Sequence, residues 1–171
     1  MLKLLMLMAS AILCIGCSSM PVKSATPMAQ YSTLIVRDIN WKETAISELA
    51  GEQLKDFVAA QPRLNELFRS EFDKYMKDMG FFETITYGNA PAGPDALILL
   101  PKIYTLKPGG FMPGASYVGL LMSGDGRLIA KYGEERRLNS SGSAPEKAVG
   151  NIEKLIRELA EDAASRLPYA R

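Results

Sequence analysis

Apolar residues along the chain follow two patterns, solid blocks and spaced stripes. The blocks are rich in β-branched and aromatic residues, which is typical of strands. They predict strands at 31–41, 81–87, 96–106, 117–122 and 127–138. The stripes repeat at steps of three and four residues, which is typical of a helix that buries one face. They predict one helix over 62–79 and another from Ser143 to about Leu167.

The first helix has a local signal at each end. Pro62 suits a first helical turn, and Gly80 suits the left-handed position that follows a last turn. Before this helix, residues 42–61 have a weak apolar repeat that Gly51 interrupts. The pattern therefore predicts only one or two short turns in that stretch.

The second helix and the hairpin before it also have end signals. Ser143 and Glu146 have the three-residue spacing of a capping box, and Pro168 ends the helical pattern. Asp125-Gly126 lies between two apolar runs, which predicts a tight turn joining antiparallel strands.

The order of these elements predicts the fold class. The predicted elements occur in the order strand, helix, strand, strand, hairpin, helix. We expect a two-layer α/β sandwich, with a mixed sheet of four to five strands and the two main helices on one face. Pro101 interrupts the third strand, where it marks an edge, a bulge or a strand break because proline cannot donate to a ladder.

The N-terminus has the features of an export signal. Lys3 precedes an apolar run, Leu4 to Ile15, that is too short to span about 30 Å of hydrocarbon comfortably. The run ends in Leu13-Cys14-Ile15-Gly16-Cys17, which resembles the bacterial lipobox. The resemblance implies cleavage before Cys17 and lipidation of that residue. Cys14 departs from the pattern, since leucine is usual three places before the lipidated cysteine, and an ordinary secretory signal or an uncleaved anchor stay as alternatives.

This interpretation divides the chain into three parts. Residues 1–16 form the signal peptide, 17–30 the lipidated cysteine with a flexible tether rich in Ser, Pro and Ala, and 31–171 a single periplasmic α/β domain. Serine after the cysteine, by resemblance to enterobacterial sorting, implies the periplasmic face of the outer membrane. Palmitate or a similar acyl chain on Cys17 would be the membrane anchor.

Composition narrows the function further. The chain has 20 Lys+Arg against 19 Asp+Glu, and nucleic-acid binders normally have a clear basic excess. It has no histidine, which removes His-dependent hydrolases and His-ligated metals. No cysteine follows Cys17, so the domain has no thiolate ligand. We therefore expect no cofactor, no metal site and no nucleic-acid partner.

The motifs in this order resemble a group of bacterial envelope lipoproteins. They are the lipobox, YSTLIVRDI, FDKYMKDMGFFETI, DALILLPKI, GDGRLIA and the capped C-terminal helix. Members of the group share the fold of the amino-terminal domain of the Tol-Pal translocation protein and of the curli-secretion lipoprotein, and the lipoprotein of Pel polysaccharide export is a small member. The resemblance implies a non-enzymatic domain that binds another envelope component or forms a ring.

Catalytic patterns are weak in this sequence. A G-x-S-x-G elbow is absent, and the glycines at 109 and 114 lack the lysine of a phosphate loop. Asp38 and Asp95 are the two carboxylates that we would test for glycoside chemistry. The charge run 134–137 predicts either an exposed edge that blocks aggregation or an intersubunit salt-bridge ladder.

Three apolar residues are candidate partner contacts. Phe111 and Met112 lie in a loop with two prolines and three glycines, where they either fold back on the sheet or form an exposed finger for a partner or the lipid interface. Trp41 either packs in the core or faces a partner. The resulting hypothesis is a lipid-anchored interaction module for envelope assembly, secretion or polysaccharide export. The alternative is a binder of a small apolar or glycan ligand in a crevice between helices and sheet.

Overall fold

The computed structural model describes residues 28, 30–109, 112–137 and 148–170. Cys17, the tether up to residue 27, Phe111 and the predicted capping box at 143–146 lie outside these residues. Within the described part of the chain, no helix is both long enough and apolar enough to cross a membrane.

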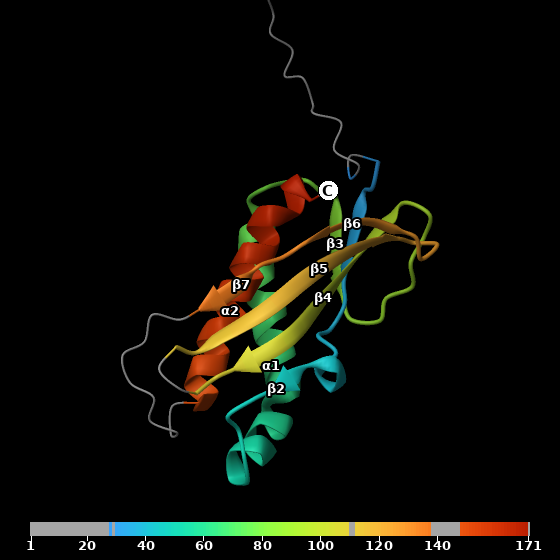
Figure 1. Ribbon diagram of the computed structural model, residues 1–171. Helices are drawn as coiled ribbons and strands as arrows, with labels where there is room; N and C mark the ends of the chain where they lie inside the picture. The colour runs from blue at the N-terminus through green and yellow to red at the C-terminus, as the bar shows by residue number, and fades with distance from the viewer. Residues whose placement is uncertain (1–27, 29, 110–111, 138–147, 171) are drawn as a thin grey trace, which may run out of the picture.

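The domain is one mixed sheet with two long helices (Figure 1). The elements are β1 (Thr33–Val36), a short 3₁₀ turn (Trp41–Glu43), β2 (Ala45–Ile46), α1 (Glu52–Lys77), β3 (Thr84–Tyr87), β4 (Ala96–Lys107), β5 (Gly114–Ser123), β6 (Leu128–Tyr132), β7 (Glu135–Arg137), α2 (Ala148–Arg166) and a 3₁₀ turn (Leu167–Tyr169). The main strand order is β3-β1-β4-β5-β6, with β2 also paired to β4 and β7 also paired to β5. The predicted α/β class is confirmed, but the sheet has seven strands rather than four to five.

The two additional strands are β2 and β7. They arise because β4 and β5 are long enough for each to pair with two short strands in succession on one side. β4 pairs in parallel with β1 along its first residues and with β2 near its end. On the far side of β5, the predicted strand 127–138 divides into β6 and β7 at Gly133. A Cβ at Gly133 would lie 2.2 Å from the carbonyl oxygen of Tyr117, so the backbone of β5 passes too close for any residue other than glycine.

Pro101 lies in the middle of a continuous central strand. The carbonyl of Leu99 accepts from the Arg37 backbone, and that of Ile103 accepts from the Thr44 hydroxyl, so both point toward the β1–β2 edge of β4. Pro101 has the same orientation and falls between the end of β1 and the start of β2. No partner strand requires an amide proton there, which explains why proline is tolerated in β4.

The first helix begins ten residues before the predicted start. It runs from Glu52 to Lys77 and contains Pro62 in its interior, so the predictions of isolated turns over 42–61 and of a first turn at Pro62 are wrong. Gly51, with φ of 56°, is the N-cap rather than an interruption inside the helix. Gly80 has φ of 61°, as its predicted left-handed position requires.

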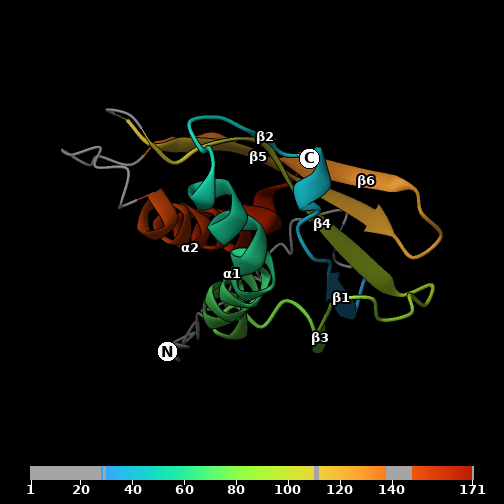
Figure 2. The same cartoon turned by 90° about the horizontal axis from the view of Figure 1, so that it is seen from below.

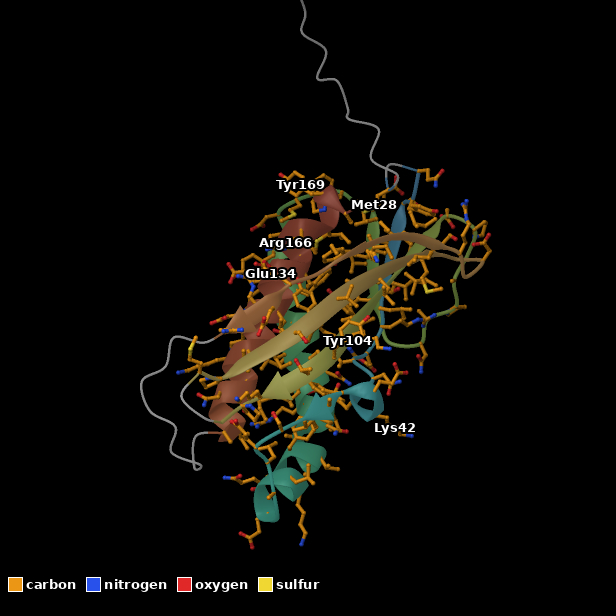
Figure 3. All side chains as sticks on the ribbon, in the orientation of Figure 1. Met28, Lys42, Tyr104, Glu134, Arg166 and Tyr169 are labelled. Atoms are coloured by element: carbon orange, nitrogen blue, oxygen red, sulfur yellow. The ribbon has the colours of Figure 1, made fainter. Side chains whose placement is uncertain are left out.

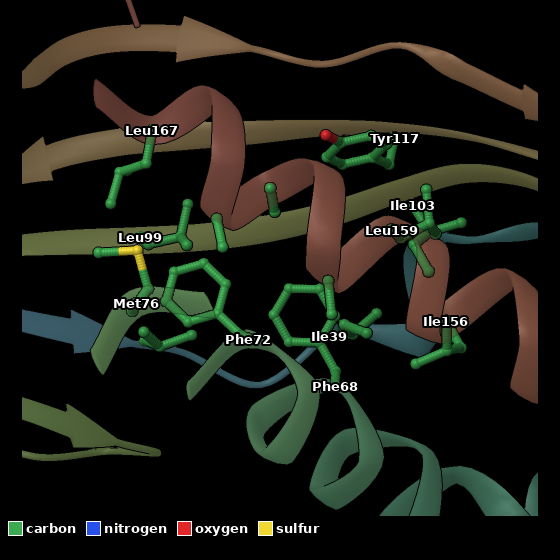
Figure 4. Close-up of a cluster of buried hydrophobic side chains, with 14 of the residues drawn as sticks. Ile39, Phe68, Phe72, Met76, Leu99, Ile103, Tyr117, Ile156, Leu159 and Leu167 are labelled. Carbon is green, nitrogen blue, oxygen red and sulfur yellow. The ribbon is translucent and has the colours of Figure 1, made fainter. Parts of the chain in front are cut away.

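Both helices lie on the same face of the sheet, as predicted, and the structure shows that they also pack against each other (Figure 2). Their stripes meet the inward residues of β4 and β5 in one core (Figure 4). The residues at its centre are fully or almost fully buried and include Phe68, Phe72 and Met76 of α1, Ile156 and Leu159 of α2, and Leu99 and Ile103 of β4. Apolar burial on this scale is the main stabilising term of the fold.

The two helices run in the same direction, which defines two ends of the domain. Met28 and the C-termini of α1 and α2 lie at one end, which we call the entry end (Figures 1 and 3). The loop between β4 and β5 and the N-termini of both helices lie at the other, the distal end (Figure 1). β4 runs obliquely toward the distal end (Figure 1), and at about 3.3 Å per residue its 12 residues are about 40 Å long.

Candidate functional site

The loop between β4 and β5 has a fixed base at the distal end. Pro108 and Pro113 are both buried where the chain leaves β4 and returns to β5. The Nδ2 of Asn151, buried in α2, donates to the carbonyl of Pro108 at 2.9 Å. On the other side, Lys107 forms a 3.0 Å ion pair with Glu48. The loop is therefore attached at its base to α2 and to the segment before α1.

Met112 is exposed at this attached loop. Its side chain is 44% exposed, whereas the prolines on either side of the loop are buried. Phe111, its neighbour, lies outside the described residues. The structure thus places Met112 at the surface of the distal end, and a contact of either residue with a partner stays a prediction.

Trp41 lies in the core, the location that the sequence left open as one of two alternatives. It is 7% exposed, and its ring meets that of Phe57 edge-on, with centroids 5.4 Å apart and an interplanar angle of 86°. Its indole N–H has no acceptor among the described residues. In this position its main role is to hold the first 3₁₀ turn against α1.

The two candidate catalytic carboxylates lie at opposite ends of β1. Asp95 is beside Thr33 at the start of the strand and accepts from the Ser32 hydroxyl at 2.9 Å. Asp38 follows the end of the strand and forms an ion pair with Arg69. Five residues of extended chain put them about 16 Å apart, beyond the range of about 5–10 Å for a glycosidase pair. The structure therefore does not bring them together.

The charge run at 134–137 contacts α2 of its own chain. Arg136 forms an ion pair with Asp162, and Glu134 forms one with Arg166. Asp162, whose side chain is only 3% exposed, also accepts from Arg166 Nε at 2.8 Å. These contacts hold β7 on α2. Glu135 and Arg137, the other two residues of the run, form a 2.9 Å ion pair with each other, so all four charges have a partner within this chain.

A tyrosine hydroxyl completes this network. The Tyr117 hydroxyl donates to Oδ2 of Asp162. Burial, with a smaller contribution from nearby Tyr132, raises the pKa of the Tyr117 phenol above its usual value, so the phenol stays a donor. Figure 3 shows two members of the cluster, Glu134 and Arg166, side by side.

Two buried polar residues of α2, Asn151 and Asp162, were not among the residues predicted from the sequence. Asn151 is four residues before Leu155, and Asp162 is three residues after Leu159, so both fall on the buried stripe. A polar residue at a core position of a helical repeat was the signal that indicates a buried hydrogen bond.

A hollow of about 440 Å³ lies where β1 and β4 begin and β5 ends, near the entry end. It is lined by Gln30, Tyr31, Pro94, Asp95, Ser123, Asp125 and Arg127. Hydrogen bonds from the Ser123 hydroxyl and the Arg127 amide lower the pKa of the Asp125 carboxyl.

The space between helices and sheet, where the sequence placed a ligand crevice, is occupied by core side chains. No group of three or more possible metal ligands occurs among the described residues.

Compared by sequence, the chain matches no protein-family model and no curated protein. Compared by structure, it is similar to an uncharacterised protein at 13% identity and a TM-score of 0.50, with 79% of this chain and 91% of that chain covered. It is similar to a DUF330 protein of Xanthomonas campestris at 10% identity and the same TM-score, with 85% and 88% covered. A PelC dodecamer subunit from Paraburkholderia phytofirmans aligns at 10% identity and a TM-score of 0.44, with 79% and 88% covered. The first two similarities establish the fold.

Proposed function

We propose that this chain is a lipid-anchored, non-enzymatic interaction module at the periplasmic face of the outer membrane, and that it supports envelope assembly, secretion or polysaccharide export. The supporting observation is the placement of two features at opposite ends of the domain. The described chain begins at Met28, eleven residues after Cys17, and Met112 is exposed at the distal end. An anchor at the entry end leaves the distal loop free to reach a partner.

The distance between these ends favours a partner over the lipid surface for the loop. A flexible chain of eleven residues has a root-mean-square reach of about 20 Å. Its fully extended limit of about 40 Å is no longer than β4. The loop would therefore reach the bilayer only with the tether stretched along the whole domain. The separation of Asp38 and Asp95 supports the non-enzymatic part of the proposal.

The experiment uses a photo-reactive amino acid in place of Met112 in living cells. A matched variant carries it in place of Leu128, which is 54% exposed near the other end. We expect the probe at 112 to crosslink to one envelope protein or to a second copy of this chain, and the probe at 128 not to do so. Mass spectrometry of the mature N-terminus tests the anchor. An unmodified Cys17, or equal crosslinking from both positions, would contradict the proposal.

The polar hollow supports a second candidate function, ligand binding. Its lining includes the carboxylates of Asp95 and Asp125 and the guanidinium of Arg127, which can hydrogen-bond the hydroxyl groups of a glycan. Binding of neutral oligosaccharides measured by calorimetry, and its loss in Arg127→Ala, would favour this function. No heat of binding across a set of envelope-derived oligosaccharides would exclude it.

A further inference from the structure

Two large aromatic side chains at the entry end are exposed to solvent. Phe81 is 56% exposed in the connection between α1 and β3, and Tyr169 is 80% exposed in the last 3₁₀ turn. Their neighbours in sequence are anchored, since Leu167 is 1% exposed and the amide of Glu83 donates to the carbonyl of Ser32 at 2.9 Å. The exposed rings therefore stand on fixed backbone rather than on free ends.

Both residues lie at the end of the domain where the described chain begins. Figure 3 shows Met28 and Tyr169 at the same end of the molecule. The connection that carries Phe81 is attached to Ser32, four residues after Met28. If Cys17 carries a lipid as proposed, a random-coil tether of eleven residues would hold this end within about 20 Å of it on average.

We propose that the entry end, through Phe81 and Tyr169, rests on the lipid bilayer and sets the orientation of the domain. This proposal rests on the lipid anchor of the proposed function. Aromatic side chains favour the boundary between water and acyl chains, and tyrosine does so with its hydroxyl toward water. The distal loop then points away from the membrane, toward its partner.

The described basic side chains close in sequence to Phe81 and Tyr169 are paired with acids, so we expect burial of the rings rather than attraction to anionic lipid to drive the contact. Lys77 is paired with Asp73, and Arg166 is paired with Glu134 and Asp162. Asp78 and Glu83 are further acids on either side of Phe81. The contact is therefore expected in neutral phosphatidylcholine vesicles and at high salt, because burial of the rings rather than charge drives it.

The experiment places a single fluorescent label on the full mature chain bound to such vesicles. The only cysteines in the sequence are Cys14, inside the signal peptide, and Cys17, whose thiol would carry the lipid, so a new cysteine takes the label alone. Asp78→Cys and Glu83→Cys, both exposed on either side of Phe81, report the entry end and leave Phe81 and Tyr169 in place. Leu54→Cys and Val58→Cys, 41% and 55% exposed at the start of α1, are matched controls at the distal end.

A nitroxide on the lipid headgroup should quench the labels at 78 and 83 at least threefold more than those at 54 and 58. Equal quenching in the two pairs, or stronger quenching at 54 and 58, would overturn the orientation that we propose. Flotation of the same samples separates the two ideas. Protein that floats without differential quenching refutes only this inference, whereas protein that does not float refutes the anchor and this inference together.

Discussion

The Asp162 cluster gives the sharpest test of how the domain is held together. Asp162→Asn keeps the size of the side chain and an acceptor for Tyr117 but removes the negative charge opposite Arg136 and Arg166. Hydrogen bonds to charged groups contribute about 1.5–3 kcal/mol each, and breaking a buried ion pair costs about 3–5 kcal/mol. Both arginines are partly exposed, so water can solvate their charges in the variant, and Arg166 still pairs with Glu134. These interactions make the destabilisation smaller than for a fully buried pair. We expect a decrease of about 2–3 kcal/mol in the free energy of unfolding.

Urea unfolding of the mature chain at pH 7, followed by circular dichroism, measures this difference. The control is Glu158→Gln on the exposed face of the same helix, which should change the free energy of unfolding by less than about 0.5 kcal/mol. The thermal midpoint of Asp162→Asn should fall by about 2–4 °C per kcal/mol for a domain of this size. If Asp162→Asn unfolds at the same urea concentration as Glu158→Gln, the network contributes nothing and the reasoning fails.

Three further predictions test the loop base, the glycines and one carboxylate. Asn151→Ala leaves the buried Pro108 carbonyl without its donor, so the free energy of unfolding should fall by about 1–3 kcal/mol; an unchanged free energy of unfolding would refute the role of Asn151 at the loop base. Gly124→Ala should destabilise, because its Cβ would meet the Gly93 carbonyl at 2.0 Å, whereas Gly150→Ala, with open space in α2, should raise the free energy of unfolding by about 0.5–1 kcal/mol; thermal midpoints compare the two. Lys74, with Arg157, lowers the pKa of the Glu71 carboxyl, so its stabilisation is present at pH 7 and lost as pH falls through that lowered pKa. Urea unfolding measures the difference in free energy of unfolding between the unsubstituted protein and Glu71→Gln, which should shrink as the pH is lowered. A difference that does not depend on pH would contradict this.

The local elements could be predicted from the sequence because their causes are local. The stripe of α2 repeats every three to four residues, and Asp125-Gly126 forms its turn with Gly126 at φ of 88°, so both were predicted correctly. The apolar block of β4 was also predicted almost to its ends. The start of α1 was predicted wrongly, because glycine and proline usually interrupt a helix and Gly51 and Pro62 were interpreted in that way. In the folded protein, packing against the sheet stabilises a helix that continues on both sides of Pro62.

The candidate site was predicted only in part. The sequence identified the unusual loop around Met112, and it allowed two positions for Trp41 without choosing between them. It indicated neither Asn151 at the base of that loop nor Asp162 under β7, because partners 43 and 45 residues distant are brought together only by folding.

The sequence by itself determined the two helix faces, the strand blocks, the hairpin and the candidate anchor at Cys17, since each depends on residues within a few positions of one another. Only the tertiary structure decided that Trp41 is buried, that Asp38 and Asp95 are apart, and that seven strands share one sheet. It also decided that the chain enters at one end while Met112 is exposed at the other. Strand pairing and the direction of each helix depend on contacts between distant segments, and no local pattern specifies those contacts.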